Sequence, residues 1–220
     1  MQFIFCEESG KDIILLKGEI YNYIFKVRRQ KSSEILYFRD PKSPKTIYEY
    51  SVESIDRRKA ELKLIKSAEN FINSEKDITL GWCVVDIKTI EKTLPMINEL
   101  GVKNIYFIYC QYSQKDIKLD FERLNKILQN SSMQSGRYNI TNLYISDSLD
   151  SFLEDFPETI AIDFSKEKLV SVNKENVSIL VGAEGGFSED EREKFQTVKG
   201  LKSVYILKSQ TAVISAISLI

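Results

Sequence analysis

Short apolar runs separated by charged or glycine-containing breaks fill the first forty residues. These runs are QFIF, DIILL, YNYIFKV and EILYF, and KSPKTIYEYSVESI then adds a turn and another strand. Such β-rich runs between breaks are typical of strands. We therefore predict a small antiparallel sheet or barrel. From Asp56 the pattern indicates one more strand and then a linker, with a domain boundary near residues 70–78.

From about residue 78 the pattern becomes an alternation of strands and helices. Strands are expected at 78–85, 104–110, 142–146, 159–164 and 177–182, with helices at 87–101 and 117–134. Ser188 and Glu191 have the capping-box spacing of a helix start. The run SVYIL then predicts a last strand and TAVISAISLI a terminal helix. This alternation indicates βαβ units, and so an α/β domain with a largely parallel sheet and helices on both faces.

Composition removes several classes of chemistry. The 220 residues are 43 % hydrophobic and 29 % charged, which is ordinary for a folded protein. Because the net charge is −1, any nucleic-acid partner must be met by a local basic patch. Histidine is absent, and this excludes Ser-His-Asp and Cys-His catalysis and histidine-ligated zinc.

The cysteines indicate no disulfide framework and no metal site. Cys6, Cys83 and Cys110 are odd in number, far apart and outside any CxxC pattern. A reducing cytoplasm fits them best. No stretch approaches the roughly 18 apolar residues of a membrane helix, and the first residues lack the pattern of a signal peptide. We therefore expect neither secretion nor membrane insertion.

The segment ILVGAEGGFSEDE (179–191) is the strongest candidate for a ligand loop. A buried strand runs into Gly182, then into Gly185 and Gly186, and then into a capped helix. Glycines let backbone amides approach a ligand closely, and ligands of open α/β sheets bind beyond the carboxyl ends of strands. The spacing fits neither a Walker loop nor a dinucleotide fingerprint. From spacing alone, a turn that merely needs positive φ explains the glycines equally well.

The carboxyl-terminal SVYILKSQTAVISAISLI repeats the order of strand, polar loop and helix. The loop would hold Ile206, Leu207, Lys208, Gln210 and Thr211. A core-packing helix with a threonine-capped start accounts for this segment at least as well. The combination of the two loops carries more information than either alone.

Together these loops resemble the 16S ribosomal RNA uracil-N3 methyltransferase family, of the SPOUT class of knotted methyltransferases. The family's GPEGGFS loop appears here as GAEGGFS (182–188), and its ILRxETA element as ILKSQTA (206–212). ELGV (99–102) and QSGR (134–137) also agree with family blocks, and FKVRR (25–29) looks like a basic strand of the family. The match touches nearly the whole chain, with specific motifs only in the carboxyl-terminal two thirds.

The resemblance implies a PUA-like, RNA-binding β-barrel at residues 1–72 and a SPOUT trefoil-knot methyltransferase domain at residues 73–220. It further implies a homodimer that makes 3-methyluridine at uracil 1498 of 16S ribosomal RNA in the small (30S) subunit, without a metal. S-adenosylmethionine would bind among the knot loops. The implied cofactor-binding residues are Leu180, Gly182, Glu184, Gly185, Gly186, Ile206, Leu207, Lys208, Thr211 and Ala212.

Methyl transfer from a sulfonium needs the acceptor in line and its N3 proton removed, and the donor supplies its own reactivity. A cation that stabilises the uracil anion would suffice, and Arg137 and Lys208 are the candidates. A solvated charge is the plainer explanation of Arg137. Candidate RNA contacts interleave cations with aromatics, as unpaired bases and phosphates require. They are Lys26, Arg28, Arg29, Lys31, Arg57 and Arg58. The plainer alternative here is a strand with Tyr21, Tyr23 and Phe25 in the core.

Three departures from the family pattern affect the acceptor side. Lys208 stands for an arginine, Gln210 for an acid and Ala183 for a proline. A non-catalytic RNA-binding protein on the same scaffold therefore stays an alternative, as does a SPOUT methyltransferase with another RNA target. Without the resemblance, the pattern would also suit a nucleotide-binding α/β protein.

Overall fold

The computed structural model describes residues 2–31, 33–72 and 76–220. Two compact units are present: Met1–Asn73 with Met133–Asn139, and Ser74–Ser132 with Ile140–Ile220. Each has its own hydrophobic core. The boundary expected after residue 72 adjoins residues 73–75, which lie outside the described residues. The structure also adds residues 133–139 to the first unit, which the sequence pattern does not suggest.

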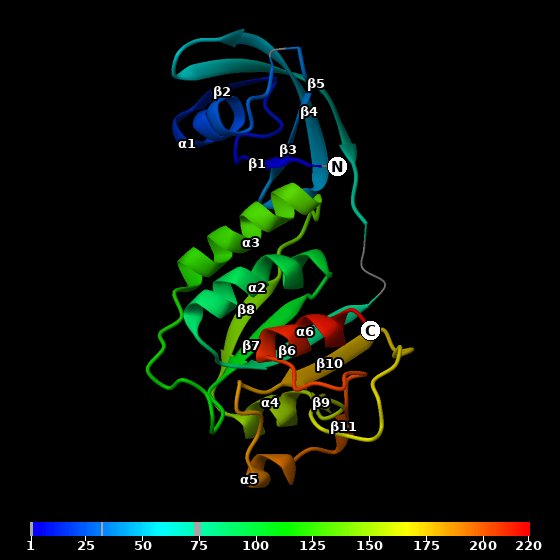
Figure 1. Cartoon of the computed structure of the whole chain (residues 1–220). Helices are drawn as coiled ribbons and strands as arrows, with labels where there is room; N and C mark the ends of the chain where they lie inside the picture. The colour runs from blue at the N-terminus through cyan, green and yellow to red at the C-terminus, as the bar shows by residue number, and fades with distance from the viewer. Residues whose placement is uncertain (1, 32, 73–75) are drawn as a thin grey trace. The chain divides into compact units, whose positions relative to one another are not determined.

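The first unit is a curled five-stranded sheet with the order β1-β3-β4-β5-β2 (Figure 1). β1 pairs parallel to β3 and the other pairs are antiparallel. Among the described residues the edge strands β1 and β2 do not pair with each other, so the expected barrel is an open sheet. The strands are β1 (Ile4–Phe5), β2 (Ile13–Lys17), β3 (Leu36–Asp40), β4 (Ser43–Ile55) and β5 (Lys59–Glu69).

The strand expected at YNYIFKV is wrong, because this segment is helical. A short helix α1 (Gly18–Tyr21) continues into a π-helical turn η1 (Asn22–Val27). Tyr21 and Ile24 are buried in the core of the unit, three residues apart as one face of a helix requires. Aromatic and β-branched residues suggested a strand, but burial of this i, i+3 face outweighs their weak intrinsic preference.

The second unit is a six-stranded, wholly parallel sheet with the order β11-β9-β10-β6-β7-β8. The predicted alternation is confirmed. The strands are β6 (Asp77–Cys83), β7 (Asn104–Ile108), β8 (Asn142–Ser146), β9 (Ile160–Ile162), β10 (Asn176–Val181) and β11 (Thr197–Lys199). The helices are α2 (Ile87–Glu99), α3 (Phe121–Ser135), α4 (Leu149–Asp155), α5 (Glu189–Arg192) and α6 (Ser209–Ile217).

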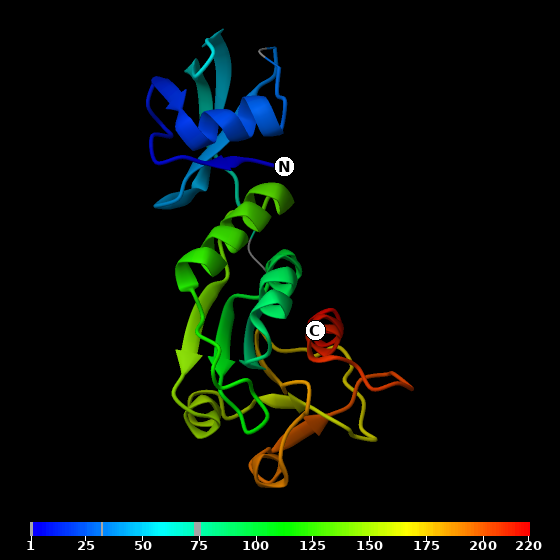
Figure 2. The ribbon, with the colours of Figure 1, turned by 60° about the vertical axis from the view of Figure 1, so that its left-hand side comes forward.

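Helices cover both faces of this sheet (Figure 2). Trp82 donates a hydrogen bond to Ser209 of α6, so this side chain of β6 faces α6. The neighbouring Gly81 faces the opposite way, where a Cβ would lie 2.7 Å from the Phe152 ring of α4. Because side chains alternate along a strand, α6 and α4 lie on opposite faces. No helix among the described residues is long and apolar enough to cross a membrane.

The carboxyl-terminal part departs from prediction at two places. SVYIL is not a strand: Val204, Tyr205 and Ile206 are 80–91 % exposed in an irregular loop. The last strand is instead β11, at the sheet edge. From that edge the chain crosses to α6, which packs against β10 and α2.

Cys83 and Cys110 form a disulfide, so the expectation of unpaired cysteines is wrong for this pair. Cys83 ends β6 and Cys110 follows the neighbouring strand β7 closely, which brings together two residues 27 positions apart in the sequence. Cys6 is a free, buried thiol. Cysteine usage therefore gives no support to a reducing compartment.

Candidate functional site

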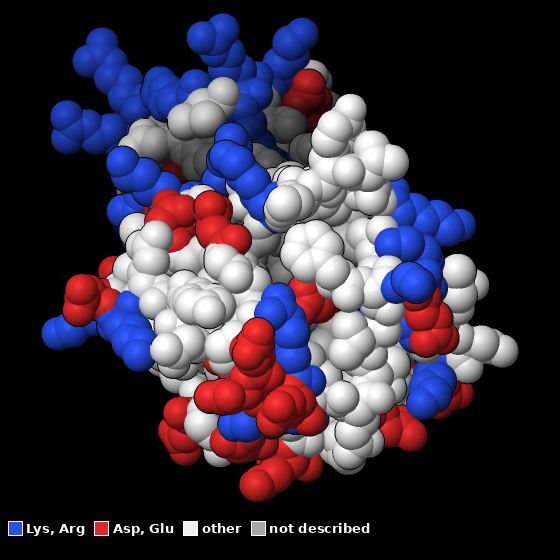
Figure 3. Space-filling model, turned by 60° about the horizontal axis from the view of Figure 1, so that its bottom comes forward, with Lys and Arg blue, Asp and Glu red and all other residues white. Residues whose placement is uncertain are grey.

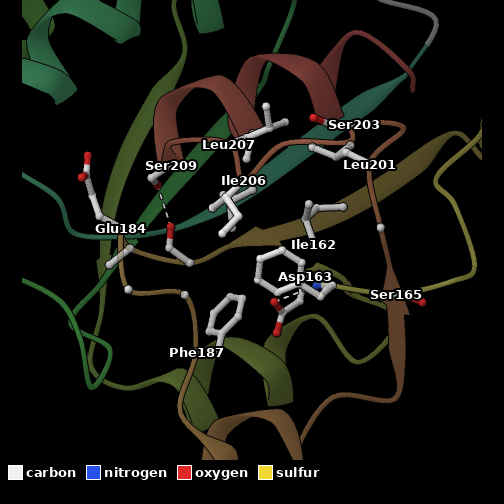
Figure 4. A pocket seen from close by; sticks show the side chains of 18 of the residues that line it. Ile162, Asp163, Ser165, Glu184, Phe187, Leu201, Ser203, Ile206, Leu207 and Ser209 are labelled. Atoms are coloured by element: carbon white, nitrogen blue, oxygen red, sulfur yellow. Dashed lines mark hydrogen bonds between the residues drawn. The ribbon is translucent and has the colours of Figure 1, made fainter.

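A pocket of about 800 Å³ opens at the carboxyl ends of β9 and β10 (Figure 4). Three segments build it: the loop after β9, the glycine loop after β10 and the loop between β11 and α6. Ile206 and Phe187 point into it from opposite sides, whereas the Glu184 carboxylate points away (Figure 4). Its lining residues are Ile162–Lys166, Lys168, Val181–Phe187, Gly200, Leu201, Ser203, Tyr205–Leu207, Ser209 and Ala212.

The glycine loop needs its glycines for two different reasons. Gly186 has φ +72°, and its N–H donates to the Ala183 carbonyl at 3.0 Å to close a tight turn. A Cβ on Gly182 would lie 3.0 Å from the Gly186 carbonyl carbon, and one on Gly185 would lie 3.1 Å from the Tyr112 Cβ. Of these three glycines, only Gly186 is explained by a positive φ. Gly182 lets two backbone segments of the loop come close, and Gly185 lets the Tyr112 side chain pack against the loop. Without side chains at these positions, main-chain groups are left free to face a ligand.

A buried serine ties the two predicted loops together. The Trp82 indole Nε1 donates to Ser209 Oγ at 2.9 Å, and Ser209 Oγ donates to the Gly182 carbonyl at 2.6 Å. Ser209 is the first residue of α6, so the start of the last helix is fixed to the start of the glycine loop (Figure 4).

The short helix α5 holds the glycine loop through two consecutive side chains. The predicted capping box is confirmed, since Ser188 N–H donates to Glu191 Oε2 and Glu191 N–H to Ser188 Oγ. Glu191 Oε1 also accepts from Gln111 N–H, in the loop after β7, at 2.7 Å. Arg192 donates to Asp163, at the end of β9, at 2.6 Å, and this bond raises the pKa of the guanidinium. One turn of helix thus joins three loops.

Acidic side chains gather over α5 on the face seen in Figure 3. Glu189, Asp190 and Glu193 are exposed there. Glu189 and Asp190 lie in the first turn of α5, where acids complement the helix dipole, whereas Glu193 is at its carboxyl-terminal end. Among the described residues, no cluster of cysteine and acidic side chains could hold a metal ion.

Most of the predicted cofactor-binding residues line one pocket. Those present are Gly182, Glu184, Gly185, Gly186, Ile206, Leu207 and Ala212. Leu180, Lys208 and Thr211 are not among its lining residues. Leu180 is fully buried in the core, and the other two are exposed in the first turn of α6 and just before it. Lys208, not a threonine, occupies the N-cap position.

The two catalytic candidates lie in different units. Lys208 is exposed immediately before Ser209. Arg137 belongs to the segment that completes the first unit and is not among the pocket-lining residues. Its Nε donates to Asn139 Oδ1 at 2.7 Å, and burial lowers its pKa to about 10. The arginine therefore stays protonated at neutral pH.

The candidate RNA contacts come from two places in the first unit. Lys26, Arg28, Arg29 and Lys31 lie in or just beyond η1, and Arg57 and Arg58 lie in the turn between β4 and β5. The expected strand with alternating aromatics is absent. Instead, the Arg28 guanidinium lies over the Tyr23 ring at 4.7 Å.

The sequence did not point to the loop after β9. Asp163, Phe164, Ser165, Lys166 and Lys168 all line the pocket. No motif marks them. The available signal is their position directly after a strand of a parallel sheet, where ligands bind.

A model of the RNA methyltransferase domain family matches residues 73–220. The chain is 31 % identical to ribosomal RNA small subunit methyltransferase E of Helicobacter pylori (strain ATCC 700392 / 26695), with 100 % of this chain and 99 % of that protein covered. The protein of that name from Aquifex aeolicus is also 31 % identical, over 97 % and 96 %. A crystal structure of the Neisseria gonorrhoeae protein of that name, bound to S-adenosyl methionine, has the same fold. Its TM-score is 0.81 at 20 % identity, with 99 % and 95 % covered.

Proposed function

Because this chain belongs to the ribosomal RNA small subunit methyltransferase E family, we propose that it transfers the methyl group of S-adenosylmethionine to N3 of uracil 1498 in 16S ribosomal RNA. One observation carries the proposal. The glycine loop and the loop before α6, which bear the family motifs, line one pocket at the carboxyl ends of parallel strands. A ribosomal RNA substrate also implies that this protein acts in the cytoplasm.

The pocket fits S-adenosylmethionine. Its volume lies within the range of small-molecule sites, and its walls are mostly apolar, with few polar groups. At Gly182 and Gly185 the glycine loop lies so close to neighbouring atoms that a Cβ at either position would crowd them. When bound, this cofactor supplies a methyl group already activated by its sulfonium.

The protein's own contribution is then positioning and charge. The N3–C bond forms as the S–C bond breaks, and the N3 proton leaves to solvent, so a nearby cation favours the uracil anion. We assign that role to Lys208, which directly precedes the pocket residue Ser209. Arg137 is the second candidate, and its guanidinium keeps its charge.

Three architectural features belong to the same proposal. The crossing of the chain from β11 to α6 supports a trefoil knot, in which the last helix passes through a loop. The first unit would be a PUA-like domain that binds RNA through its exposed cations. Two copies would form a homodimer with each pocket at the subunit interface.

The test compares uracil 1498 by mass spectrometry in cells with and without this gene. Deletion is expected to remove 3-methyluridine, and the wild-type gene to restore it. Gly185→Trp forces an indole against Tyr112, which must displace the glycine loop that lines the pocket, and is expected to restore nothing. Gly185→Ala, which adds only a Cβ at 3.1 Å from Tyr112, serves as the graded control. Persistence of the modification after deletion would refute the assigned target and direct the search to other RNAs.

A non-catalytic RNA-binding role is the second candidate. It is favoured by Gln210, which replaces an acid of the family pattern. Its Oε1 is buried without a hydrogen-bond partner among the described residues. Binding of small-subunit RNA with no methyl transfer by the purified protein would support this role over the first.

A further inference from the structure

The rim of the pocket, formed by the lining residues of segments 163–168 and 200–207, exposes two aromatic rings that the fold leaves uncovered. Phe164, the second residue after β9, is 76 % exposed, and Tyr205, in the loop before α6, is 80 % exposed. Both line the pocket. Single exposed apolar residues are common on protein surfaces. Two exposed rings from different loops at the mouth of one pocket are better explained by a ligand.

The backbone beneath both rings is held in place. Ser203 Oγ donates to the Tyr205 carbonyl at 2.8 Å and accepts from the Tyr205 N–H at 3.1 Å. On the other loop, the Phe164 N–H donates to the Asp163 carboxylate at 2.8 Å, and that carboxylate is paired with Arg192. The rings are therefore presented on fixed supports, and this lowers the entropy cost of binding a partner.

The two loops are also tied to each other. The Gly200 N–H donates to the Glu167 carbonyl and the Leu169 N–H to the Gly200 carbonyl, both at 2.8 Å. A Cβ on Gly200 would lie 2.4 Å from the Ser165 carbonyl oxygen, so only glycine permits this approach. Both sides of the rim thus behave as one structure.

Two lysines lie on the same two loops as the rings. Lys166 and Lys202 are exposed and have no ion-pair partner among the residues described. The acids of the same loops are already paired, Asp163 with Arg192 and Glu167 with Lys199. These two loops therefore combine apolar rings with positive charge, while Glu184 of the glycine loop adds one acid to the pocket lining.

We propose that this rim binds unpaired RNA around the acceptor base. Phe164 and Tyr205 stack on bases, and Lys166 and Lys202 meet phosphates. The identity of the acceptor rests on the proposed function. The proposed homodimer would bring a second copy beside the pocket, but the rim itself suits RNA better, because a symmetric interface would repeat the lysines on both sides, and lysine is depleted from interface cores.

The test uses Phe164→Ala and Tyr205→Ala in the full chain. Fluorescence anisotropy measures binding of a fluorescein-labelled ten-nucleotide oligouridylate, and calorimetry measures the Kd for S-adenosylmethionine. Each variant is expected to weaken oligouridylate binding about tenfold, as loss of one base–aromatic stack does, and to leave the cofactor Kd within about twofold. Tyr205→Phe, which keeps the ring, and Val204→Ala, which removes an exposed neighbour without one, should bind the oligonucleotide as the wild type does.

Methyl transfer to small ribosomal subunits provides the second readout, with KM for RNA raised and kcat little changed. Lys166→Gln should reduce the salt dependence of oligonucleotide binding by about one charge. Wild-type oligouridylate binding by both alanine variants would overturn the proposal. An equal loss of cofactor affinity would assign the rings to the cofactor site, and a change of sedimentation would assign them to a subunit interface. If the wild type methylates no small-subunit RNA but oligonucleotide binding still needs both rings, the proposed function fails and the rim stands.

Discussion

Glu191 is the residue on which the glycine loop most depends. Each carboxylate oxygen accepts one backbone N–H, from Ser188 and from Gln111, and the side chain is 8 % exposed. A carboxylate accepts at both oxygens, whereas an amide accepts at one only. The charge is thus used as a double acceptor that joins two loops.

Glu191→Gln should therefore leave one buried N–H without an acceptor. We expect a loss of about 1–3 kcal/mol in the free energy of unfolding, measured by urea denaturation. We also expect about tenfold weaker binding of S-adenosylmethionine by calorimetry. Asp190→Asn, on the exposed side of the same turn, is the matched control. Equal behaviour of the two variants would contradict the role given to Glu191.

Lys208 is expected to act through its charge. Lys208→Ala should lower kcat for methyl transfer by roughly tenfold to a hundredfold, somewhat less than the loss of a buried oxyanion donor. Lys208→Arg should retain most of the rate. Lys194→Ala removes an exposed lysine paired with Asp150 and serves as the control. An unchanged kcat in Lys208→Ala would rule this side chain out.

Residue-level prediction succeeded where glycine spacing carried the signal. Gly182, Gly185 and Gly186 stand out in the sequence and line the pocket. Asp163 and Phe164 do not stand out, because their role follows from the parallel pairing of β9 with β10. The sequence does not specify that pairing.

Among the helices, α2 offers the clearest test of a local signal. The Asp86 carboxylate caps it by accepting from the Thr89 N–H at 3.0 Å, and hydrogen bonds from the Thr89 side chain and then from its backbone lower the pKa of Asp86. Asp86→Ala should cost about 1 kcal/mol of stability at pH 7. Asp86→Asn should cost less, and Asp116→Ala, at an exposed loop position, should cost nothing measurable.

The sign of the pH dependence follows from the lowered pKa. The charge of Asp86 contributes stability above the unfolded pKa of about 3.9, and this contribution is lost as the pH falls through the lower folded pKa. The stability difference between the wild type and Asp86→Asn should therefore be constant from pH 5 to 8 and vanish in stronger acid. A difference that persists in acid would show that charge is not involved.

Elements with a strong period were predictable, and those decided by tertiary packing were not. The strand expected at SVYIL has the right residues, but no neighbouring strand pairs with it, and its side chains stay exposed. The segment Gly18–Val27 has the composition of a strand and forms a helix, because Tyr21 and Ile24 complete the core of the first unit.

For the molecule as a whole, the disulfide between Cys83 and Cys110 should matter for stability. Closing a loop of 27 residues constrains the unfolded chain by about 3.5 kcal/mol. Urea unfolding followed by Trp82 fluorescence should show that loss on addition of dithiothreitol. A variant with Cys83→Ala and Cys110→Ala should not respond to the reductant, and an equal response would refute this assignment. Trp82 is the single tryptophan, so the signal reports the second unit alone.

The two-part organisation was visible in the change of pattern, but its discontinuity was not. Met133 accepts a hydrogen bond from the Phe3 N–H at its carbonyl and packs against the core of the first unit. Nothing in the periodicity of residues 121–135 shows that the end of that helix belongs to the first unit.

This discontinuity sets an order of events during synthesis. The chain must grow by about sixty residues beyond Asn73 before Met133 exists, which takes about 3–12 s at 5–20 residues per second. For those seconds the emerging sheet lacks the segment that covers its core. The amino-terminal unit is made first but is completed late, after two strands and most of two helices of the second unit have already been translated.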